Sequence, residues 1–299
     1  MHIAYIGLGK MGFNMVERMR EKGHTVVAFD PSKENAERAT TAGVTTASSI
    51  ATLIAATPAP RTVWIMVPHA AVDAVLDKLT PHLSPKDTVI EGGNSPYQET
   101  IRRAKKLARK GIKMLDVGVS GGPTGARRGA CLMVGGPIET FETNEPLFKD
   151  LSVKRGYAYV GENGAGHFVK MVHNGIEYGM MQAIAEGFDV LRASEYQVPL
   201  TEVARLYNSG SVIESRLMGW LLSGFEAYGE DLAGITGRAA ASGEGLWTID
   251  AAHELDVPVK VIEDSLKARE KSHKKPSYQG QIISVMRNQF GGHDAGTGH

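Results

Sequence analysis

Three glycines near the start of the chain constrain its fold more than any other feature of the sequence. They form the segment Gly7-Leu8-Gly9-Lys10-Met11-Gly12, which follows the apolar run Ile3–Ile6 directly and precedes a helix-like stretch. The first glycine of such a pattern allows a tight turn, the second lets the backbone approach a pyrophosphate, and the third lets a helix pack closely on a strand. The N-terminus of that helix then faces the anion. The pattern predicts a parallel α/β sheet whose first turn binds a dinucleotide, the alternative being a glycine turn in a sheet that binds no nucleotide.

An acidic residue lies close to the spacing of about 20 residues at which dinucleotide-binding sheets contact the ribose. The apolar run Thr25–Phe29 ends at Asp30. A carboxylate here hydrogen-bonds the 2′-hydroxyl of NAD and repels the 2′-phosphate of NADP. Lys33 and Arg38 are the nearest cations that could accommodate NADP. We therefore expect NAD, with NADP less favoured, and the following cofactor-binding residues: Gly7, Leu8, Gly9, Lys10, Met11, Gly12, Asp30, Val67 and Asn94.

The hydrophobic pattern changes near the middle of the chain. Up to about residue 135, short apolar runs alternate with helical or turn-rich stretches, as in a parallel sheet with crossover helices. From about Gly164 onward, apolar residues recur at helical spacing. We predict an α/β N-terminal Rossmann-type dinucleotide-binding domain over residues 1–163, followed by an all-α C-terminal domain over residues 164–299. The predicted strands are Ile3–Ile6, Thr25–Phe29, Thr62–Val67, Thr88–Glu91, Met114–Val117 and Leu132–Val134, and the predicted helices cover 165–194, 200–208, 211–222, 246–255, 258–271 and 278–289.

Composition argues against several classes of protein. The chain has 33 Lys+Arg and 33 Asp+Glu, so no net field would attract nucleic acid or an anionic membrane surface. We expect no leader segment, and we find no apolar stretch near the ~20 residues that span a bilayer. The single cysteine, Cys131, fits a reducing cytoplasm, and the ten histidines show no paired ligand spacing, so we assign no metal. We expect a cytoplasmic protein that acts on a small molecule.

One predicted helix carries a row of polar residues. Five of them fall at offsets 0, 3, 4, 7 and 8, which places them on one face: Lys170, His173, Asn174, Glu177 and Tyr178. Apolar residues surround the row, and two glycines in the same segment, each costing about 1 kcal/mol relative to Ala, indicate close approach of another backbone or a ligand. Such a row could bind an anionic polyhydroxy substrate and transfer protons. The alternative is a helix whose Lys and Glu extend to water while its His and Asn bond to neighbouring backbone.

Four segments together resemble the 6-phosphogluconate dehydrogenase family of the β-hydroxyacid dehydrogenase superfamily, in its shorter, NAD-preferring form. They extend from one end of the chain toward the other and comprise Gly7–Gly12, Glu91–Ser95, Val117–Gly129 and Lys170–Tyr178. The last segment discriminates, because relatives that act on small hydroxyacids keep the Lys and the Asn but usually lack the His and the Glu. The resemblance implies an enzyme that converts 6-phospho-D-gluconate to D-ribulose 5-phosphate and CO2 while reducing NAD, in gluconate utilisation or the pentose phosphate pathway.

The resemblance also implies roles for individual residues, with Lys170 as general base and Glu177 as general acid. The substrate contacts that it implies are His173, Asn174, Arg269, Arg287 and His293, with Tyr178 contacting the phosphate. Ser120, Gly121 and Gly122 would present hydroxyl and backbone donors to the substrate, and Asn94, at the carboxyl end of a predicted strand, could contact both substrate and nicotinamide. In the family segment that Arg287–His293 resembles, the Arg and the His reach into the neighbouring subunit's site, which implies a homodimer or homotetramer. The alternatives are solvated charge for these cations, a simple turn for Ser120–Gly122, and a turn cap for Asn94.

Two features depart from the longer NADP-dependent members of this family. Those enzymes carry a phosphate-binding Lys and Thr where this chain has Ser242 and Glu244, and they have a second half of the helical domain that is missing here. A carboxylate beside a substrate phosphate is unfavourable, so either the loop is displaced or the phosphate is held differently. Rival interpretations are a β-hydroxyacid dehydrogenase that oxidises a small 3-hydroxy acid without decarboxylation, an imine reductase-like member, and a catalytically silent dinucleotide-binding sensor.

Overall fold

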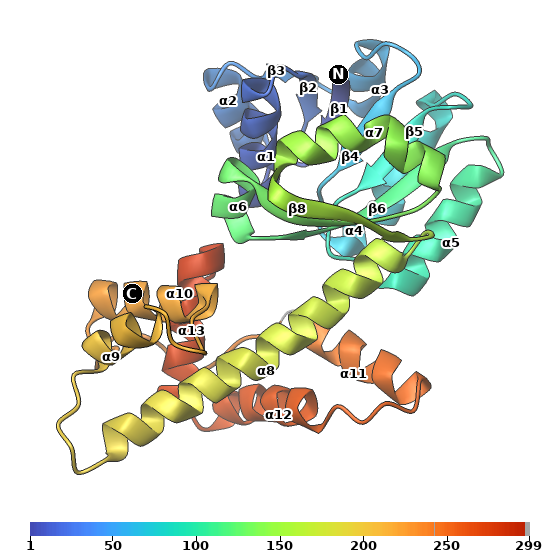
Figure 1. The fold of residues 1–299 in the computed structure, drawn as a ribbon. Coiled ribbons are helices and arrows are strands. Elements are labelled where there is room, and N and C mark those ends of the chain that lie inside the picture. The colour runs from blue at the N-terminus through green and yellow to red at the C-terminus, as the bar shows by residue number, and fades with distance from the viewer. Residues whose placement is uncertain (242, 297–299) are drawn as a thin grey trace. The chain divides into compact units, whose positions relative to one another are not determined.

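The computed structural model describes residues 1–241 and 243–296 and divides the chain into two compact units. Unit 1, Met1–Met171, is built around one sheet, and unit 2, Val172–His299, is built from helices (Figure 1). Helix α8, Ala165–Ala193, begins in unit 1 and continues into unit 2. The predicted class, an α/β dinucleotide-binding fold followed by an all-α part, is confirmed.

The sheet of unit 1 has the strand order β3-β2-β1-β4-β5-β6-β7-β8. Its strands are β1 His2–Ile6, β2 Thr25–Phe29, β3 Thr45–Thr46, β4 Thr62–Ile65, β5 Thr88–Glu91, β6 Lys113–Ser120, β7 Ala130–Gly135 and β8 Ser152–Gly161. Neighbouring strands from β3 to β6 are parallel, with Ile6 of β1 beside Phe29 and Ile65 and with Glu91 of β5 beside Asp116. The carboxyl ends of these strands therefore meet at one edge, where ligands bind in open α/β sheets.

The far end of the sheet differs from the prediction of a parallel sheet that ends near residue 135. Strand β7 is antiparallel to β6, because the connection Gly121–Gly129 is shorter than the dozen or so residues that a parallel crossover requires. Strand β8, which runs parallel to β7, was missed. Its first half contains Lys154, Arg155 and Gly156 and carries a register shift against β7, so it lacks the apolar run by which the other strands were found.

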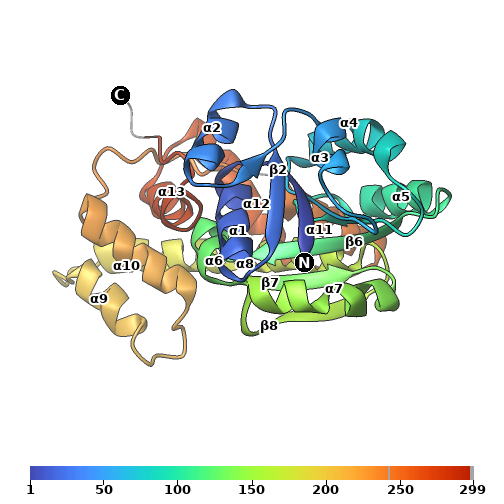
Figure 2. The same cartoon turned by 90° about the horizontal axis from the view of Figure 1, so that it is seen from above.

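Helices cover both faces of this sheet (Figure 2). They are α1 Lys10–Glu21, α2 Lys33–Thr41, α3 Ile50–Ala55, α4 His69–Leu79, the 3-10 turn Thr80–His82, α5 Tyr97–Ala108, α6 Gly122–Arg128 and α7 Ile138–Leu151. Buried residues of α1, α6 and α7 share one hydrophobic cluster with the sheet, and those of α3, α4 and α5 share a second. The sheet is thus the middle layer of a three-layer unit.

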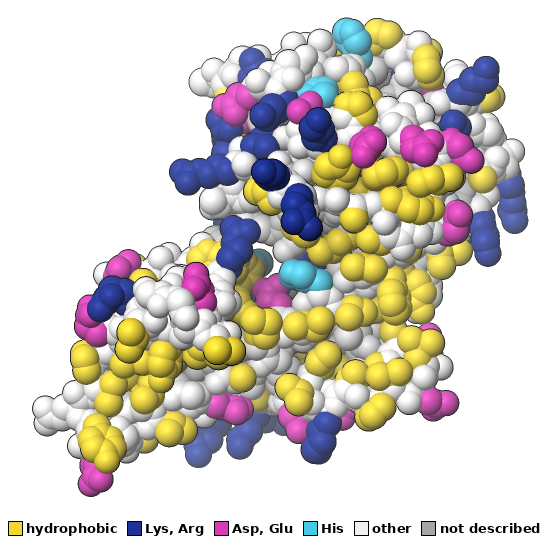
Figure 3. All heavy atoms as spheres, in the orientation of Figure 1, with side chains coloured by type: hydrophobic (Ala, Val, Ile, Leu, Met, Phe, Trp, Pro, Cys, Tyr) yellow, Lys and Arg dark blue, Asp and Glu magenta, His cyan; other side chains and the backbone are white. Residues whose placement is uncertain are grey.

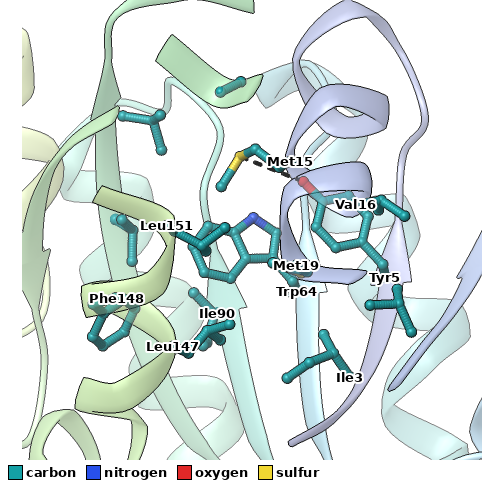
Figure 4. Packing of buried hydrophobic residues seen from close by; sticks show 14 of the residues in the cluster. Ile3, Tyr5, Met15, Val16, Met19, Trp64, Ile90, Leu147, Phe148 and Leu151 are labelled. Carbon is teal, nitrogen blue, oxygen red and sulfur yellow. Dashed lines mark hydrogen bonds between the residues drawn. The ribbon is translucent and has the colours of Figure 1, made fainter. Parts of the chain in front are cut away.

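Aromatic packing fixes the core on the α1 and α7 face (Figure 4). Trp64 of β4 stacks on Tyr5 of β1 with ring centroids 6.3 Å apart, and Phe148 of α7 lies 6.4 Å from Trp64. The Tyr5 hydroxyl donates to Met15 Sδ at 3.6 Å, and burial raises the pKa of this hydroxyl well above its usual range. Burial of each such side chain contributes roughly 2–3 kcal/mol before conformational entropy is subtracted. This core holds the first glycine turn on a rigid base.

The described residues of unit 2 contain the rest of α8 and five further helices. These are α9 Leu200–Tyr207, α10 Arg216–Tyr228, α11 Glu244–Glu254, α12 Lys260–Lys274 and α13 Tyr278–Gly291. Buried residues of α8, α9, α10 and α13 form one hydrophobic cluster. Helix α10 begins later than the predicted residue 211, because the Ser215 side chain caps it by accepting from the Met218 amide at 3.2 Å. Among the described residues, we find no helix with the length and apolarity that membrane crossing demands.

Candidate active site

The first glycine turn has the geometry of a dinucleotide cradle. Gly7 has φ +103°, and a Cβ there would clash with the carbonyl of Met66. A Cβ on Gly12 would clash with the Gly7 carbonyl, so this glycine lets α1 lie directly on β1. A Cβ on Gly9 would meet no atom within 4 Å, so packing within the protein does not require glycine there. The open space beside Gly9 at the start of α1, whose first turn has no acidic residue, fits a pyrophosphate.

Asp30 lies at the carboxyl end of β2, next to this turn. Its Oδ2 accepts from the Leu8 amide at 2.6 Å, and its Oδ1 accepts from the Ser32 amide at 2.8 Å. A carboxylate has about four acceptor sites, so both oxygens can accept further hydrogen bonds from a ribose. Arg38 donates to the Leu8 carbonyl and lies over the Phe13 ring at 4.6 Å. Asp30, which is predicted to bind the ribose, is therefore hydrogen-bonded directly to the glycine turn.

A second loop at the same sheet edge follows β5. A Cβ on Gly93 would lie 2.8 Å from the Val67 carbonyl, and a Cβ on Gly7 would lie 3.0 Å from Val67 Cγ1. Val67 therefore lies between the first glycine turn and the Gly92-Gly93 turn. Asn94 follows this turn and is exposed. Val67 and Asn94, both predicted to contact the cofactor, thus follow the carboxyl ends of the neighbouring strands β4 and β5.

A third loop connects β6 to the short helix α6. Ser120 is the last residue of β6 and is partly buried. Gly121 and Gly122 have φ +126° and +62°, so both positions require a backbone conformation that other residues rarely adopt. Residues 120–122 therefore form a tight turn between strand and helix, as the alternative interpretation predicted. A turn can also contact a substrate, so the predicted substrate contacts of these residues stay a prediction.

Lys170, in the second turn of α8, is held against β6. A Cβ on Gly118 would clash with Lys170 Cβ, and it would lie 2.9 Å from the Gly166 carbonyl. A Cβ on Gly166 would in turn lie 2.5 Å from the Asp116 carbonyl. The helix backbone thus lies directly on the strand, and Lys170 is only 7% exposed. A lysine so deeply buried is not an ordinary solvated side chain.

The polar row continues along α8 into unit 2. His173 Nδ1 lies 3.0 Å from Asn174 Oδ1 and 3.8 Å from Glu177 Oε2. Asn174 is 8% exposed, whereas Ile176 on the same helix is 53% exposed. The pattern is the reverse of an ordinary surface helix, which exposes its polar residues and buries its apolar ones. Figure 3 shows apolar side chains on the visible face of the helical unit.

The two glycines of this segment accommodate neighbouring helices. A Cβ on Gly175 would lie 2.7 Å from Thr248 Cγ2 of α11, and a Cβ on Gly179 would lie 3.3 Å from Val261 Cγ1 of α12. Side chains of these two helices, rather than a ligand, therefore account for the glycines. The same approach brings Tyr178, which is buried, against Gly245 at the start of α11.

Arg269 of α12 is a fully buried cation beside Tyr178. Its guanidinium carbon lies 3.5 Å from the Tyr178 ring centroid, and Nη1 donates to the Ala240 carbonyl at 3.1 Å. Within the part of the chain that the structure describes, its Nε has no hydrogen-bond partner. Burial lowers the pKa of Arg269 to about 10, and the positive charge of Arg287 acts in the same direction. Two buried arginines that raise each other's electrostatic energy have the charge that an anion would compensate.

Glu244 and Ser242 are the positions at which the sequence departs from the longer enzymes. Glu244 begins α11 and is buried, and its charge raises the pKa of Arg269, against the effect of burial. The carboxylate therefore partly offsets the charge of the arginine. Ser242 lies outside the described residues.

The last predicted contact, His293, follows α13 and is exposed. Its carbonyl accepts from Asn288 Nδ2 at 2.9 Å, and its ring lies 5.7 Å from that of Phe290. Arg287, on α13 itself, is buried instead. The two cations of this segment thus have different surroundings. No group of three or more His, Cys, Asp or Glu side chains suited to a metal ion occurs among the described residues.

Sequence reasoning missed two buried polar residues of unit 1, Asp116 and His167. Asp116 is a lone acid inside the apolar run Met114–Val117, and His167 precedes the polar row of α8 by one turn. Both are almost fully buried. An acid at an interior position of a predicted strand was the available signal, because such residues are rarely buried unless they are paired.

Comparisons with known proteins identify the family. A model of the NAD-binding domain of 6-phosphogluconate dehydrogenase matches residues 2–161, and a model of the C-terminal domain of 6-phosphogluconate dehydrogenase matches residues 166–289. The Bacillus subtilis protein YqeC, provisionally named a 6-phosphogluconate dehydrogenase, is 46% identical over 98% of both chains.

Two further comparisons agree. The NAD(+)-dependent, decarboxylating 6-phosphogluconate dehydrogenase of Haloferax volcanii is 40% identical over 98% of both chains. A Plasmodium falciparum 6-phosphogluconate dehydrogenase, solved in its apo form, with NADP+ and with 6-phosphogluconate, has a TM-score of 0.83 and 27% identity over 97% of this chain and 70% of its own. The first half of the chain is thus an NAD(P)-binding domain, and the chain belongs to the 6-phosphogluconate dehydrogenase family.

Proposed function

We propose that the protein oxidatively decarboxylates 6-phospho-D-gluconate to D-ribulose 5-phosphate and CO2 with reduction of NAD+. The observation that carries the proposal is its 40% identity, over 98% of both chains, to a relative named for an NAD(+)-dependent, decarboxylating activity on this substrate. The buried polar row of α8 supports it, because this chemistry needs one group that exchanges a proton with oxygen and another that delivers one to carbon.

Lys170 is proposed as the base that removes the proton from the substrate hydroxyl. A base must be a neutral amine, and Lys170 is a buried lysine that could bind the substrate hydroxyl away from water. Bound NAD+ would accept the hydride from the carbon that carries this hydroxyl. The resulting β-keto acid loses CO2 when its carbonyl is polarised, and the protonated Lys170 can donate to that oxygen. One group then serves as base in the first step and as acid in the second.

Glu177 is proposed as the acid that protonates the enediol at carbon after CO2 has left. It lies seven residues beyond Lys170 on the same helix, which is about 10 Å along the axis at 1.5 Å per residue. The two groups can thus act on different atoms of one six-carbon substrate. His173 and Asn174, between them on this face, are proposed to bind its hydroxyl groups, together with Asn94, Ser120, Gly121 and Gly122.

The substrate phosphate is proposed to bind at Arg269 and Arg287, with Tyr178 beside them. The burial of both guanidinium groups supports this assignment, since a dianion would compensate charge that the protein only partly neutralises. Glu244 reduces the net charge of the site but leaves it positive. This is one way in which the phosphate can be held without the Lys and Thr of the longer enzymes.

NAD rather than NADP is the proposed cofactor. Asp30 is held by two backbone amides at the end of β2, so a negative charge is fixed where a 2′-phosphate would have to bind. Gly7, Leu8, Gly9, Lys10, Met11 and Gly12 would hold the pyrophosphate, and Val67 and Asn94 would lie near the nicotinamide.

A homodimer or homotetramer is proposed as the active form, in which the C-terminal segment with His293 completes the neighbouring site. Unit 2 exposes many large apolar residues, which supports burial against another copy. They are Ile176, Met180, Val190, Tyr196, Leu206, Val212, Ile213, Leu246, Leu255, Val257 and Val261. Arg287 is proposed to serve its own chain, because its field already reaches Arg269 there. A cytoplasmic location is proposed from the single cysteine, Cys131.

Mixing two inactive variants tests the shared site. When Lys170→Met and His293→Ala proteins are unfolded together and reassembled, random pairing in a dimer should restore about a quarter of the sites. Lys170→Met mixed with Arg287→Ala should restore none. Equal failure of both mixtures would contradict the role of His293 in a neighbouring site.

The proposed reaction is tested by measuring NADH and CO2 together. The purified protein with 6-phosphogluconate and NAD+ should release one CO2 for each NADH, and the product should be a pentulose phosphate. 3-Hydroxyisobutyrate serves as the comparison substrate. Faster turnover of that acid, without CO2, would instead support the small-hydroxyacid alternative.

A further inference from the structure

The Asp116 side chain caps the N-terminus of α8. It lies on β6, and its Oδ1 accepts from the Gly164 amide at 2.8 Å while its Oδ2 accepts from the His167 amide at 3.0 Å. A carboxylate that accepts from the first amides of a helix is stabilised by their hydrogen bonds and by the helix dipole. Lys170 lies one turn beyond His167. The two hydrogen bonds of Asp116 thus fix the turn of α8 from which Lys170 projects.

His167 connects this turn to β5 and α5. Its Nδ1 lies 2.7 Å from Thr100 Oγ1 and 3.7 Å from Glu91 Oε2, with both ionisable side chains 1% exposed. Among the described residues, Glu91 Oε2 and His167 Nε2 have no hydrogen-bond partner. Buried polar atoms with incomplete hydrogen bonding are unfavourable for stability, so their presence in a native structure calls for an explanation.

Glu91 extends the cluster to the loop that carries Asn94. Its Oε1 accepts from Ser95 Oγ at 2.9 Å, and Arg103 Nη1 donates to the same hydroxyl at 3.2 Å. Arg103 is itself buried, with Nη1 3.7 Å from Glu91 Oε2. The residues on either side of Gly92-Gly93-Asn94 are therefore bonded to each other. Glu91 and Asp116 are also neighbours in the sheet register.

We propose that Asp116, His167 and Glu91 are positioning residues that set Lys170 and Asn94 in register with each other. The inference rests on the proposed function, in which both residues contact the reacting substrate. The cluster joins the α8 turn before Lys170 to the β5 loop before and after Asn94 through buried hydrogen bonds and ion pairs. Hydrogen bonds depend on direction as well as distance, so these contacts add to the close backbone packing of α8 on β6 in fixing the position of the helix.

Replacing Asp116 by Asn tests the proposal. The amide keeps the size of the side chain but turns an NH2 group toward one of the two backbone amides, so one hydrogen bond becomes a contact between two donors. A small misplacement of a reacting group is enough to lower kcat about 10- to 100-fold, while the dissociation constant of NAD+ should change by no more than about twofold.

Asp87→Asn is the matched control. Asp87, which directly precedes β5, is as buried as Asp116 and also accepts from two backbone amides, those of Arg61 and Ser84. It differs from Asp116 in that it also pairs with the Arg61 guanidinium at 3.1 Å. Both variants should lower Tm, but only Asp116→Asn should lower kcat of the folded enzyme. Equal kcat values in the two variants would show that Asp116 contributes only to stability and would overturn the proposal.

His167 provides a second test if Asp116→Asn does not fold. His167→Asn keeps a polar group near the position of Nδ1 and can still bond to Thr100, whereas His167→Leu cannot. We expect kcat to fall in His167→Leu and to recover largely in His167→Asn, with an unchanged KM for NAD+. Equal kcat in the two variants would contradict the positioning role.

Hydrogen exchange separates failure of this inference from failure of the proposed reaction. If the wild-type protein forms no NADH from 6-phosphogluconate, the proposed function is wrong, but the effect of the cluster on α8 is still measurable. Asp116→Asn should speed exchange of the Gly164 and His167 amides and of the amides around Lys170, and Asp87→Asn should not. Unchanged exchange in Asp116→Asn would overturn the inference regardless of substrate.

Discussion

Gly118 of β6 and Lys170 of α8 lie against each other so closely that the strand has no room for a Cβ at this position. Gly118 lies two residues beyond Asp116 on β6, and Lys170 lies three residues beyond His167, whose amide Asp116 accepts from. The amide of Gly166 on the same helix is 2.6 Å from the position of a Cβ on Gly135 of β7. Lys170 therefore projects from a helix turn that three glycines allow to rest on two strands, β6 and β7. The location of the proposed base is determined by backbone packing as much as by its own side chain.

Gly118→Ala should displace this turn and lower kcat strongly. The new methyl group would overlap Lys170 Cβ, so the helix must shift, and a shift of about 1 Å can cost about 100-fold in rate. NAD+ binding, measured by fluorescence titration, should be nearly unchanged. Gly187→Ala on the same helix is the control: its Cβ meets no atom within 4 Å, and it should keep full activity and gain about 1 kcal/mol of stability.

Asp30→Ser should shift the cofactor preference toward NADP. The substitution removes a fixed negative charge from the proposed site of the 2′-phosphate and leaves Arg38 nearby, on the Leu8 carbonyl. We expect the ratio of kcat/KM for NADP+ to that for NAD+ to rise about tenfold or more. Glu34→Ser removes an exposed acid from the same region and should leave the ratio unchanged. A constant ratio in Asp30→Ser would show that Asp30 does not select the cofactor.

Arg269→Met should weaken substrate binding without destabilising the protein. The KM for 6-phosphogluconate should rise about 10- to 100-fold, since a hydrogen-bonded charge contributes roughly 1.5–3 kcal/mol to binding. Tm should stay constant or rise, because an apolar side chain replaces a buried charge whose pKa burial lowers to about 10. Arg205→Met, on the exposed side of α9, is the control. An unchanged KM in Arg269→Met would remove this residue from the phosphate site.

Asp73 should make stability depend on pH in the acid range. The hydrogen bond from buried Arg103 is the main cause that lowers the pKa of Asp73 from 3.8 to about 2. A lowered carboxyl pKa means that the stabilisation is present above 3.8 and is lost as pH falls toward about 2. Asp73→Asn should therefore lower Tm at pH 7. The difference in Tm between this variant and the wild type should vanish as the pH falls to about 2. Asp77→Asn, whose acid is paired with exposed Lys106, should change Tm little at either pH.

The parts of this molecule that sequence could predict are those with local signatures. The glycine turn, Asp30 and the polar row depend on spacing within one or two elements, and the predicted helix 165–194 differs from α8 by one residue at its C-terminal end. Strand β8 was missed because Lys154, Arg155 and Gly156 interrupt its pattern. Local spacing gave no sign of this edge strand.

Interactions between distant segments could not be predicted in the same way. Arg269 lies in a helix rich in Lys and Glu and looks like a surface residue in the sequence, yet it is 1% exposed. Asp116 is 48 residues from the Gly164 amide that it accepts from. Nothing near Asp116 in the sequence specifies that contact, since it arises only when α8 docks on β6 and β7.

The measurement that tests the account most directly is NADH formation from 6-phosphogluconate by Lys170→Met, with NAD+ binding measured in parallel. Methionine has similar length and no titratable group, so the variant should bind NAD+ with nearly wild-type affinity and form no NADH above background. Substantial NADH formation by this variant would contradict Lys170 as the base and, with it, the catalytic role assigned to the polar row of α8.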